Sequence, residues 1–253
     1  MGVAYNSRIV TDSLVLALDA GNTKSYPGTG EYWFDLSGNS NTATRTNNAG
    51  YGGQVTYNSS GYFDYSMNSP AVTAGANAGN GFFMSTMIIP STGGFSLSAF
   101  IRRNLSVKAG GDRETIFSNT GDAEGWRFGI GSDGSIYYLI GGTGGSGYQE
   151  GGLGGSTLTN GNWHMMTAVF DRAAVFGSYT IYGYIDGVSS GSATITAGAS
   201  GNSAFRSQNP GVGYAGCCDV FAGQIAQVLA YSKVLTAAEV QQNFNALRGR
   251  YGI

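Results

Sequence analysis

The chain has 253 residues, of which 43 are glycine and only 11% are charged, against about 25% charged residues in ordinary soluble domains. A net charge of −2 gives no electrostatic reason to expect nucleic-acid binding, and no apolar run reaches the roughly 18 residues that insertion into a membrane needs. Residues 1–11 lack the basic start and apolar stretch of a secretory signal, so the sequence does not predict export. The 16 tyrosines and 13 phenylalanines exclude a disordered chain, and the glycines are expected in turns between packed strands.

Short apolar runs that alternate with polar residues begin early in the chain. Leu14, Leu16 and Leu18 line one face of a predicted strand that ends at Asp19. A second strand is expected at residues 95–101, where apolar residues alternate with serines. This period of two residues is typical of strands with one buried face.

A hairpin is predicted in the middle of the chain. Trp126, Phe128 and Ile130 alternate, and Ser-Asp-Gly-Ser at 132–135 then leads into the apolar run 136–140. An Asp-Gly pair supplies the positive φ values that tight hairpins need, so the two runs are expected to pair.

Two further strands are expected at residues 164–170 and 179–185, and Asp186-Gly187 turns the chain into a later strand at 193–197. Both faces of the first of these strands are largely apolar. That pattern is typical of a central strand covered on both sides.

One helix is predicted near the C-terminus, at residues 236–248. Thr236 and Glu239 have the spacing of a capping box, in which each side chain accepts a hydrogen bond from the backbone N–H of the other residue. Three apolar residues then recur at helical spacing and form one stripe: Val240, Phe244 and Leu247.

Many short strands and one docked helix predict an all-β fold, an antiparallel two-sheet jelly-roll sandwich with one short C-terminal α-helix. No linker is long enough to divide the chain. We therefore expect a single domain over residues 1–253, with residues 1–12 as an N-terminal arm.

Four segments match a known group of proteins in the right order. The first is residues 14–39, which contains Leu-Val-Leu-Ala-Leu-Asp-Ala-Gly-Asn and Trp-Phe-Asp-Leu-Ser-Gly-Asn, and the second is residues 95–101. The third is residues 163–187, which contains Trp-His-Met-Met-Thr-Ala-Val-Phe-Asp and Tyr-Ile-Asp-Gly. The fourth is residues 221–253, which begins with Phe-Ala-Gly-Gln-Ile-Ala-Gln-Val. In these segments the chain resembles the laminin-G-like and pentraxin-like group of the concanavalin A-like lectin/glucanase superfamily. The resemblance implies the same jelly-roll fold.

Residues 9–16, 24–28 and 249–253 resemble lectin-fold structural proteins of tailed phages, notably those that infect marine bacteria. This resemblance implies a non-enzymatic virion structural protein, made in the host cytoplasm and displayed at the virion surface on capsid (decoration or fibre) or tail. Its partners would be other virion proteins and like subunits in a symmetric cluster. Residues 1–12 and 248–253 are the expected contact segments.

The alternative is a carbohydrate-binding adhesin or lectin that recognises host surface glycans. Such a site needs an exposed aromatic platform with hydrogen-bonding groups beside it. Trp126, Tyr137, Tyr138 and Tyr148 lie around glycine-rich segments and are the candidates. The competing interpretation of these aromatic residues is that they anchor the core or an interface.

Calcium is the one cofactor that the resemblance suggests, because several proteins of this fold bind it through loop oxygen atoms. Asp19 with Asn22, and Asp35 with Asn39, are the candidate ligands, since carboxylate and amide oxygens suit a hard cation. Alternatively, these side chains accept hydrogen bonds from nearby backbone N–H groups and hold their own turns.

The superfamily includes glucan hydrolases, so a glycoside hydrolase is the remote alternative. Retaining hydrolysis needs two carboxyl groups about 5 Å apart. The nearest candidates are Asp112 with Glu114 and Asp122 with Glu124, which are expected in glycine-flanked loops without the rigidity that catalysis needs. No catalytic residue is therefore predicted.

Cys217 and Cys218 are adjacent in the chain, and a disulfide between neighbours would be far from preferred geometry. They are expected to be free thiols that pack as small apolar residues. Zinc is not expected, because it needs four ligands and His164 is the only histidine. His164 itself is predicted to pack in the core.

Overall fold

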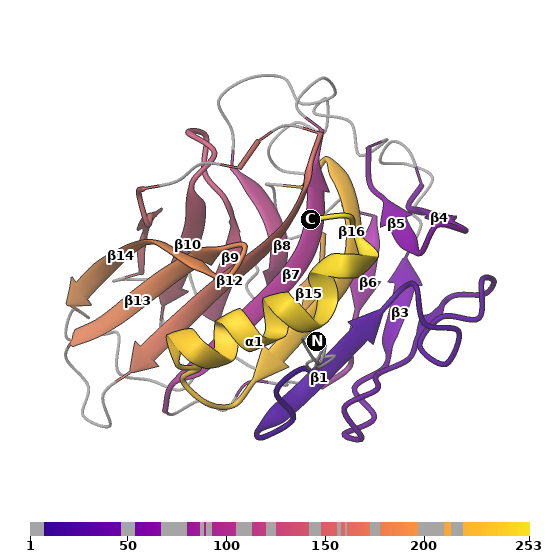
Figure 1. The fold of residues 1–253 in the computed structure, drawn as a ribbon, viewed down its shortest axis with the longest axis horizontal. Helices are drawn as coiled ribbons and strands as arrows, with labels where there is room; N and C mark the ends of the chain where they lie inside the picture. The colour runs from indigo at the N-terminus through magenta and orange to yellow at the C-terminus, as the bar shows by residue number, and fades with distance from the viewer. Residues whose placement is uncertain are drawn as a thin grey trace, which may run out of the picture.

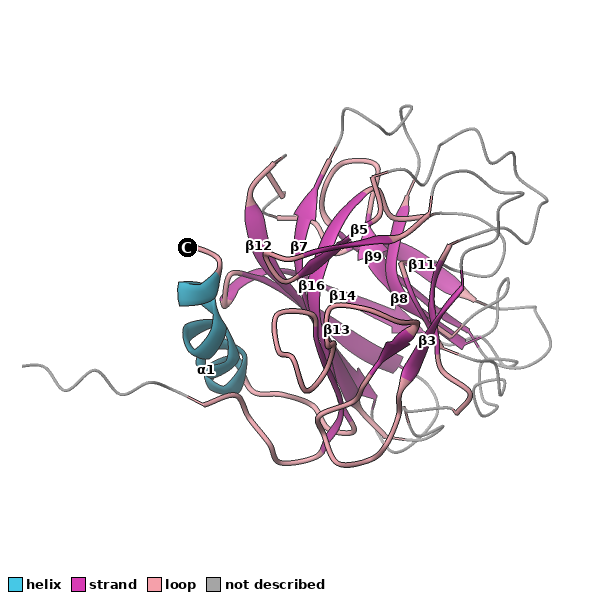
Figure 2. Ribbon diagram, turned by 90° about the vertical axis from the view of Figure 1, so that its right-hand side faces the viewer, coloured by secondary structure: helices cyan, strands magenta, loops and turns pink. Residues whose placement is uncertain are grey.

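The computed structural model describes residues 8–46, 54–66, 80–86, 89, 93–104, 113–119, 125–141, 148–155, 158–159, 161–172, 178–196, 210–213 and 220–253. These residues form two antiparallel sheets packed face to face, with one helix on the outer side of one of them (Figures 1 and 2). The predicted two-sheet sandwich with one C-terminal helix is confirmed.

The sheet under the helix, the helix-bearing sheet, has eight strands in the order β14-β13-β12-β7-β16-β5-β4, and β1 also pairs with β16. These strands are β1 (Leu14–Asp19), β4 (Thr56–Asn58), β5 (Tyr62–Asp64), β7 (Phe95–Arg103), β12 (Trp163–Arg172), β13 (Ser178–Ile185), β14 (Val188–Thr196) and β16 (Gly223–Tyr231). The strand predicted to be central, β12, lies between β7 and β13 and is buried over most of its length.

The second sheet has eight strands in the order β11-β10-β9-β8-β15-β6-β3-β2. They are β2 (Tyr32–Trp33), β3 (Ala43–Thr46), β6 (Gly81–Phe83), β8 (Glu114–Ser118), β9 (Gly125–Ile130), β10 (Ile136–Gly141), β11 (Gln149–Gly152) and β15 (Gly211–Val212). The predicted hairpin is β9–β10, and Gly134 in its turn has a φ of 84°.

The main core lies between the sheets, and a second one lies between the helix-bearing sheet and the helix α1 (Ala237–Leu247). The predicted stripe of Val240, Phe244 and Leu247 packs on outward-facing side chains of that sheet, such as Phe100 and Leu229. Both faces of β7 and β16 are therefore covered, which explains why these strands are buried almost throughout. Among the helices that the structure describes, none is long and apolar enough to cross a membrane.

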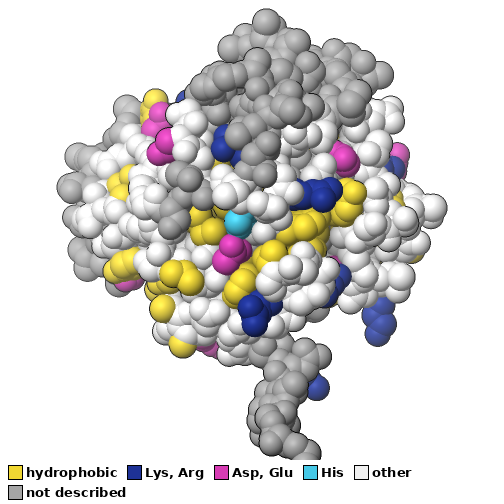
Figure 3. All heavy atoms as spheres, turned by 45° about the horizontal axis from the view of Figure 1, so that its top comes forward, with side chains coloured by type: hydrophobic (Ala, Val, Ile, Leu, Met, Phe, Trp, Pro, Cys, Tyr) yellow, Lys and Arg dark blue, Asp and Glu magenta, His cyan; other side chains and the backbone are white. Residues whose placement is uncertain are grey.

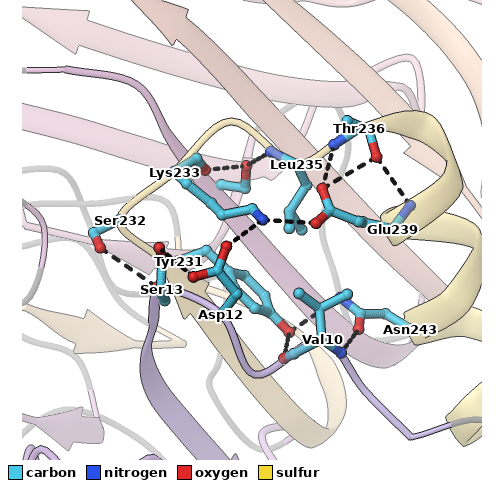
Figure 4. A network of polar contacts seen from close by, with 11 residues as sticks. Val10, Asp12, Ser13, Tyr231, Ser232, Lys233, Leu235, Thr236, Glu239 and Asn243 are labelled. Atoms are coloured by element: carbon cyan, nitrogen blue, oxygen red, sulfur yellow. Dashed lines mark hydrogen bonds and ion pairs between the residues drawn. The ribbon is translucent and has the colours of Figure 1, made fainter.

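Part of the N-terminal arm is bound to the domain (Figure 4). The backbone N–H of Val10 donates to Asn243 Oδ1 at 2.8 Å, and Tyr231 Oη donates to the Val10 carbonyl at 3.1 Å. Asp12 Oδ2 is 2.8 Å from Lys233 Nζ. The end of the predicted arm therefore packs between α1 and β16, whereas residues 1–7 lie outside the described part of the chain.

C-terminal residues also pack against the domain. After the short 3-10 helix Arg248–Arg250, the ring of Tyr251 stacks on Phe100 with a centroid distance of 4.4 Å. Arg250 reaches across to Asp19 of β1 at 2.6 Å. These two side chains are therefore engaged within the domain, and the contact role of residues 248–253 stays a prediction.

The capping box at the start of α1 is confirmed. Thr236 Oγ1 accepts a hydrogen bond from the N–H of Glu239, and Glu239 Oε2 accepts one from the N–H of Thr236. Lys233 Nζ lies 2.6 Å from Glu239 Oε1 (Figure 4). The hydrogen bond from Lys233 is the main reason why the pKa of Glu239 is lowered, followed by that from the backbone of Thr236.

Replacing Glu239 with alanine is expected to lower the free energy of unfolding at neutral pH by about 1 kcal/mol. Because the folded-state pKa of Glu239 is lowered, its contribution is complete above its ordinary pKa of about 4.3 and disappears as pH falls through the folded-state pKa. Urea unfolding at neutral pH and in acid should show the difference between wild type and variant shrinking in acid. Glu31→Ala, which removes an exposed carboxylate, is the control, and a difference that stays constant with pH would contradict the prediction.

Candidate functional site

The aromatic residues proposed as a sugar platform do not form one. Trp126 and Tyr138 point into the main core, where Trp126 is fully buried and packs edge-on against Phe117 at 4.9 Å. Tyr137 points to the opposite face of β10 but is also buried. Only Tyr148, with 45% of its surface exposed, is accessible. The prediction is wrong for Trp126, Tyr137 and Tyr138, because a position near glycine-rich segments does not show whether a side chain is covered.

Tyr137 instead belongs to a polar cluster on the second sheet. Its hydroxyl donates to Glu150 Oε2, and Arg113 Nη1 lies 2.5 Å from the same oxygen. Burial, reinforced by the hydrogen bond to Glu150, raises the pKa of Tyr137. Partial burial opposes ionisation of Glu150, but the hydrogen bonds from Tyr137 and Arg113 outweigh it and lower the pKa of Glu150. The three side chains satisfy one another.

The first calcium candidate, Asp19 with Asn22, does not fit a cation. Arg250 places Nη1 2.6 Å from Asp19 Oδ2 and Nη2 2.8 Å from Asp19 Oδ1. The backbone N–H of Gly21 also donates to Asp19 Oδ1, and Asn22 Oδ1 accepts from the N–H of Lys24. A guanidinium that is bidentate on the carboxylate occupies the place that a cation would take.

The second calcium candidate is also used within the protein. Asp35 Oδ1 accepts from the N–H groups of Ala17 and Ser37 at 2.8 and 2.9 Å, and Oδ2 accepts from Ser37 Oγ at 2.7 Å and from the N–H of Asn41 at 3.0 Å. Asn39 Nδ2 donates to the Leu14 carbonyl. In the described ranges no three His, Cys, Asp or Glu side chains gather as metal ligands. These residues hold turns, as the alternative interpretation proposed.

Of the four hydrolase candidates, one lies within the described residues. Glu114 begins strand β8, contrary to the loop expected for it, and is fully buried. Its Oε1 is 2.6 Å from Arg103 Nε, and its Oε2 accepts from the N–H of Ala222 at 3.2 Å. Such a carboxylate cannot meet a substrate at the surface. Asp112, Asp122 and Glu124, like Cys217 and Cys218, lie outside the described residues.

His164 connects two turns. Its Nε2 is 2.6 Å from Thr159 Oγ1, and its Nδ1 is 2.7 Å from Asp186 Oδ2. A hydroxyl, an imidazole and a carboxylate in this order can activate a nucleophile, but Asn162 Nδ2 donates to the same Thr159 oxygen and occupies a lone pair that attack would use. His164 is half-buried and does not lie in the core as predicted; it ties the turn before β12 to the Asp186-Gly187 turn.

A cluster that the sequence did not indicate lies on the outer face of the helix-bearing sheet, just past the C-terminal end of α1. We call it the Trp163 cluster, and its members come from four neighbouring strands and the C-terminus: Tyr62, Asp64, Arg102, Trp163, Gln224 and Tyr251. Residues paired directly across strands point to the same face. Asp64 pairs with Gln224, Gln224 with Arg102, and Arg102 with Trp163.

Aromatic rings surround the guanidinium of Arg102. Its Cζ lies 5.5 Å from the ring centroid of Tyr62 and 5.3 Å from that of Trp163. The ring centroids of Tyr62 and Trp163 are 5.7 Å apart, and those of Trp163 and Tyr251 are 5.1 Å apart. All four side chains are partly exposed. Figure 3 shows hydrophobic side chains gathered in a band beside the histidine, with basic side chains along its edge.

A chain of hydrogen bonds holds Arg102 in place. Its Nε donates to Gln224 Oε1 at 2.9 Å, and Gln224 Nε2 donates to Asp64 Oδ2 at 3.1 Å. Gln224 is buried, so this part of the chain is fixed from beneath. Partly exposed rings beside a rigidly held polar group are the composition of a recognition site for a small polar ligand.

Comparison with known proteins agrees with this fold. The family model described as the concanavalin A-like lectin/glucanases superfamily matches residues 77–241. The chain belongs to this superfamily. No curated protein matches the sequence well enough to be compared with this concanavalin A-like chain.

Solved structures with the same concanavalin A-like fold include binding domains of botulinum neurotoxins. The serotype D/C VPI 5993 binding domain has a TM-score of 0.60 and 18% identity over 94% of this chain and 53% of its own. The DC binding domain in complex with rat synaptotagmin II has a TM-score of 0.58 and 17% identity, over 94% and 52%. The type G receptor binding domain has a TM-score of 0.55 and 16% identity, over 92% and 51%. The chain spans about half the length of these domains, and the likeness concerns the fold.

Proposed function

We propose that this protein is a non-catalytic recognition module of lectin fold that binds glycans at the Trp163 cluster. The observation that carries the proposal is the position of Arg102, held by Gln224 and flanked by the partly exposed rings of Tyr62 and Trp163. The solved structures of similar fold are themselves binding domains, which supports recognition as the role.

The composition of the cluster suits a sugar. The C–H faces of a sugar ring are apolar and pack on aromatic side chains, while its hydroxyls need fixed hydrogen-bonding groups beside those rings. Trp163 and Tyr62 supply the first, and Arg102 supplies the second. The site is formed by strands and not by loops, so the groups are preorganised.

The state of three described carboxylates supports binding without turnover. Glu114 is buried against Arg103, Glu150 accepts from Tyr137 and Arg113, and Asp64 accepts from Gln224. A glycosidase needs a pair of accessible carboxyl groups. The proposal therefore has no hydrolytic step.

Replacing Trp163 with alanine is expected to weaken glycan binding by at least about tenfold, because an aromatic anchor at the centre of a site carries much of its affinity. A glycan array probed with the wild type and with the variant is the measurement. The matched control is Phe34→Ala, which removes a 41% exposed ring directly after β2, beside Tyr32. Equal binding by wild type and Trp163→Ala, or no glycan signal from the wild type, would overturn the proposal.

A second proposal concerns where the module is displayed. The resemblance of residues 9–16, 24–28 and 249–253 to tailed-phage virion proteins favours a place on a virion surface, on capsid or tail, beside other virion proteins and like subunits. Sedimentation of the purified protein with empty capsids and with isolated tails is the test. Co-sedimentation with either supports display on the particle, and a protein that stays in the supernatant with both contradicts it.

A further inference from the structure

We infer that the glycan recognised at the Trp163 cluster carries an anionic group, a carboxylate or a sulfate on a sugar ring, and that Arg102 binds this group. The inference rests on the proposed function and adds the class of ligand to it. It follows from the charge of Arg102, which no carboxylate of the described ranges pairs, and from the way in which that charge is held.

Three other arginines bind carboxylates within the described residues, and Arg102 differs from them. Arg103 pairs with Glu114, Arg113 with Glu150, and Arg250 with Asp19. Each of these guanidinium groups has its counter-charge within the domain.

Among the described residues, Arg102 has no carboxylate partner. Its one hydrogen bond runs from Nε to the neutral amide of Gln224. The nearest carboxylate along the network, Asp64, accepts instead from Gln224 Nε2 at 3.1 Å and from the N–H of Ser66 at 2.7 Å. The terminal nitrogens Nη1 and Nη2 therefore keep their N–H donors for a ligand.

The guanidinium is oriented before any ligand arrives. Nε is fixed by Gln224, and the rings of Tyr62 and Trp163 lie within the distance at which a cation is attracted to an aromatic face. A planar fork with two free N–H groups matches two oxygens of a carboxylate or a sulfate. The apolar rings beside it exclude water from part of its surface, which strengthens a charged hydrogen bond relative to one in open solvent.

The geometry favours an acidic sugar over a free anion. An anion alone would use the fork of Arg102 and leave the aromatic surface of Trp163 uncovered. A sugar that carries the anion places its ring on this surface while its acidic group meets Nη1 and Nη2. Sialic and uronic acids supply a carboxylate, and sulfated sugars supply a sulfate, so the shared chemistry is an oxyanion attached to a sugar.

The test is an array of matched glycan pairs that differ only in the acidic group: sialylated, uronic-acid and sulfated glycans beside their neutral parents. The wild type is expected to prefer acidic members by about 10- to 100-fold, the range of a hydrogen bond to a charged group. The sialic and uronic pairs report on carboxylate and the sulfated pairs on sulfate. Rising salt should reduce the preference, because the contact is between charges.

Arg102→Gln is expected to lower the affinity for acidic members more than that for their neutral parents, so that the preference is lost, and Arg102→Lys to retain part of it. The control is Arg8→Gln, which removes the same charge from an exposed position lining a different part of the surface, near Leu14. Thermal unfolding confirms that each variant is folded. Neutral and acidic members bound equally by the wild type would overturn this inference and leave the proposed function standing. Absence of binding to every glycan would overturn both.

Discussion

Replacing Arg103 with methionine is expected to lower the free energy of unfolding by about 3–5 kcal/mol, because it leaves a buried charge without a partner. Glu114 is fully buried at the start of β8, and Arg103 Nε lies 2.6 Å from its Oε1. The second oxygen of Glu114 accepts only one further hydrogen bond in the described residues, from the N–H of Ala222. Urea unfolding of wild type and variant measures the loss.

The double variant Arg103→Met, Glu114→Gln is the control for this interpretation. Glutamine keeps an oxygen for the N–H of Ala222 but removes the unpaired charge, so the double variant is expected to be more stable than Arg103→Met alone. If the second substitution restores none of the free energy of unfolding, the loss comes from packing around Arg103 and not from an unpaired charge on Glu114.

Replacing Trp126 with alanine is expected to lower the free energy of unfolding by about 3–5 kcal/mol through the cavity that it leaves. Trp126 is fully buried between the sheets and touches Phe95 and Phe117 at centroid distances of 6.0 and 4.9 Å. Its indole Nε1 has no hydrogen-bond partner among the described residues. Trp126→Phe, which keeps much of the volume and removes this unpaired N–H, is therefore expected to cost far less.

Thermal and urea unfolding of both Trp126 variants measure these losses. Glycan binding by the folded variants shows whether Trp126 acts in the core or in the binding site. Because Trp126 lies inside the sandwich, its variants should bind glycans as the wild type does whenever they are folded. A Trp126→Ala protein of native stability that no longer binds glycans would show that this side chain is a surface platform after all.

Strand alternation, turn residues and helix capping predicted the architecture well, because each of these signals depends on only a few neighbouring residues. Alternation placed Leu16 and Leu18 on the core face of β1, although a register shift turns Leu14 toward the helix side. The Asp186-Gly187 pair connects β13 to β14 with positive φ at both residues. Thr236 and Glu239 start the helix because the hydrogen bonds that cap it lie within one turn.

The site could not be predicted in the same way, because alternation does not show what covers each face of a sheet. Phe100 and Arg102 point to the same side of β7, yet the C-terminal ring of Tyr251 covers Phe100 and leaves Arg102 partly open. Trp126 and Trp163 both lie near the start of a strand, but Trp126 of the second sheet faces the main core and Trp163 of the helix-bearing sheet faces out beside Tyr62.

The sequence by itself determined the antiparallel sandwich, its main hairpin turns and the capped helix, since strand and helix periods and turn chemistry are properties of neighbouring residues. Only the tertiary structure decided the partners of the charged groups. Asp19 meets Arg250, 231 positions away, which contacts both of its carboxylate oxygens. Arg102 meets Gln224 across 122 positions and has no carboxylate partner in the part of the chain that the structure describes. Which side chain neutralises which charge depends on distances between strands that are remote along the chain, and those distances exist only once the sheets have formed.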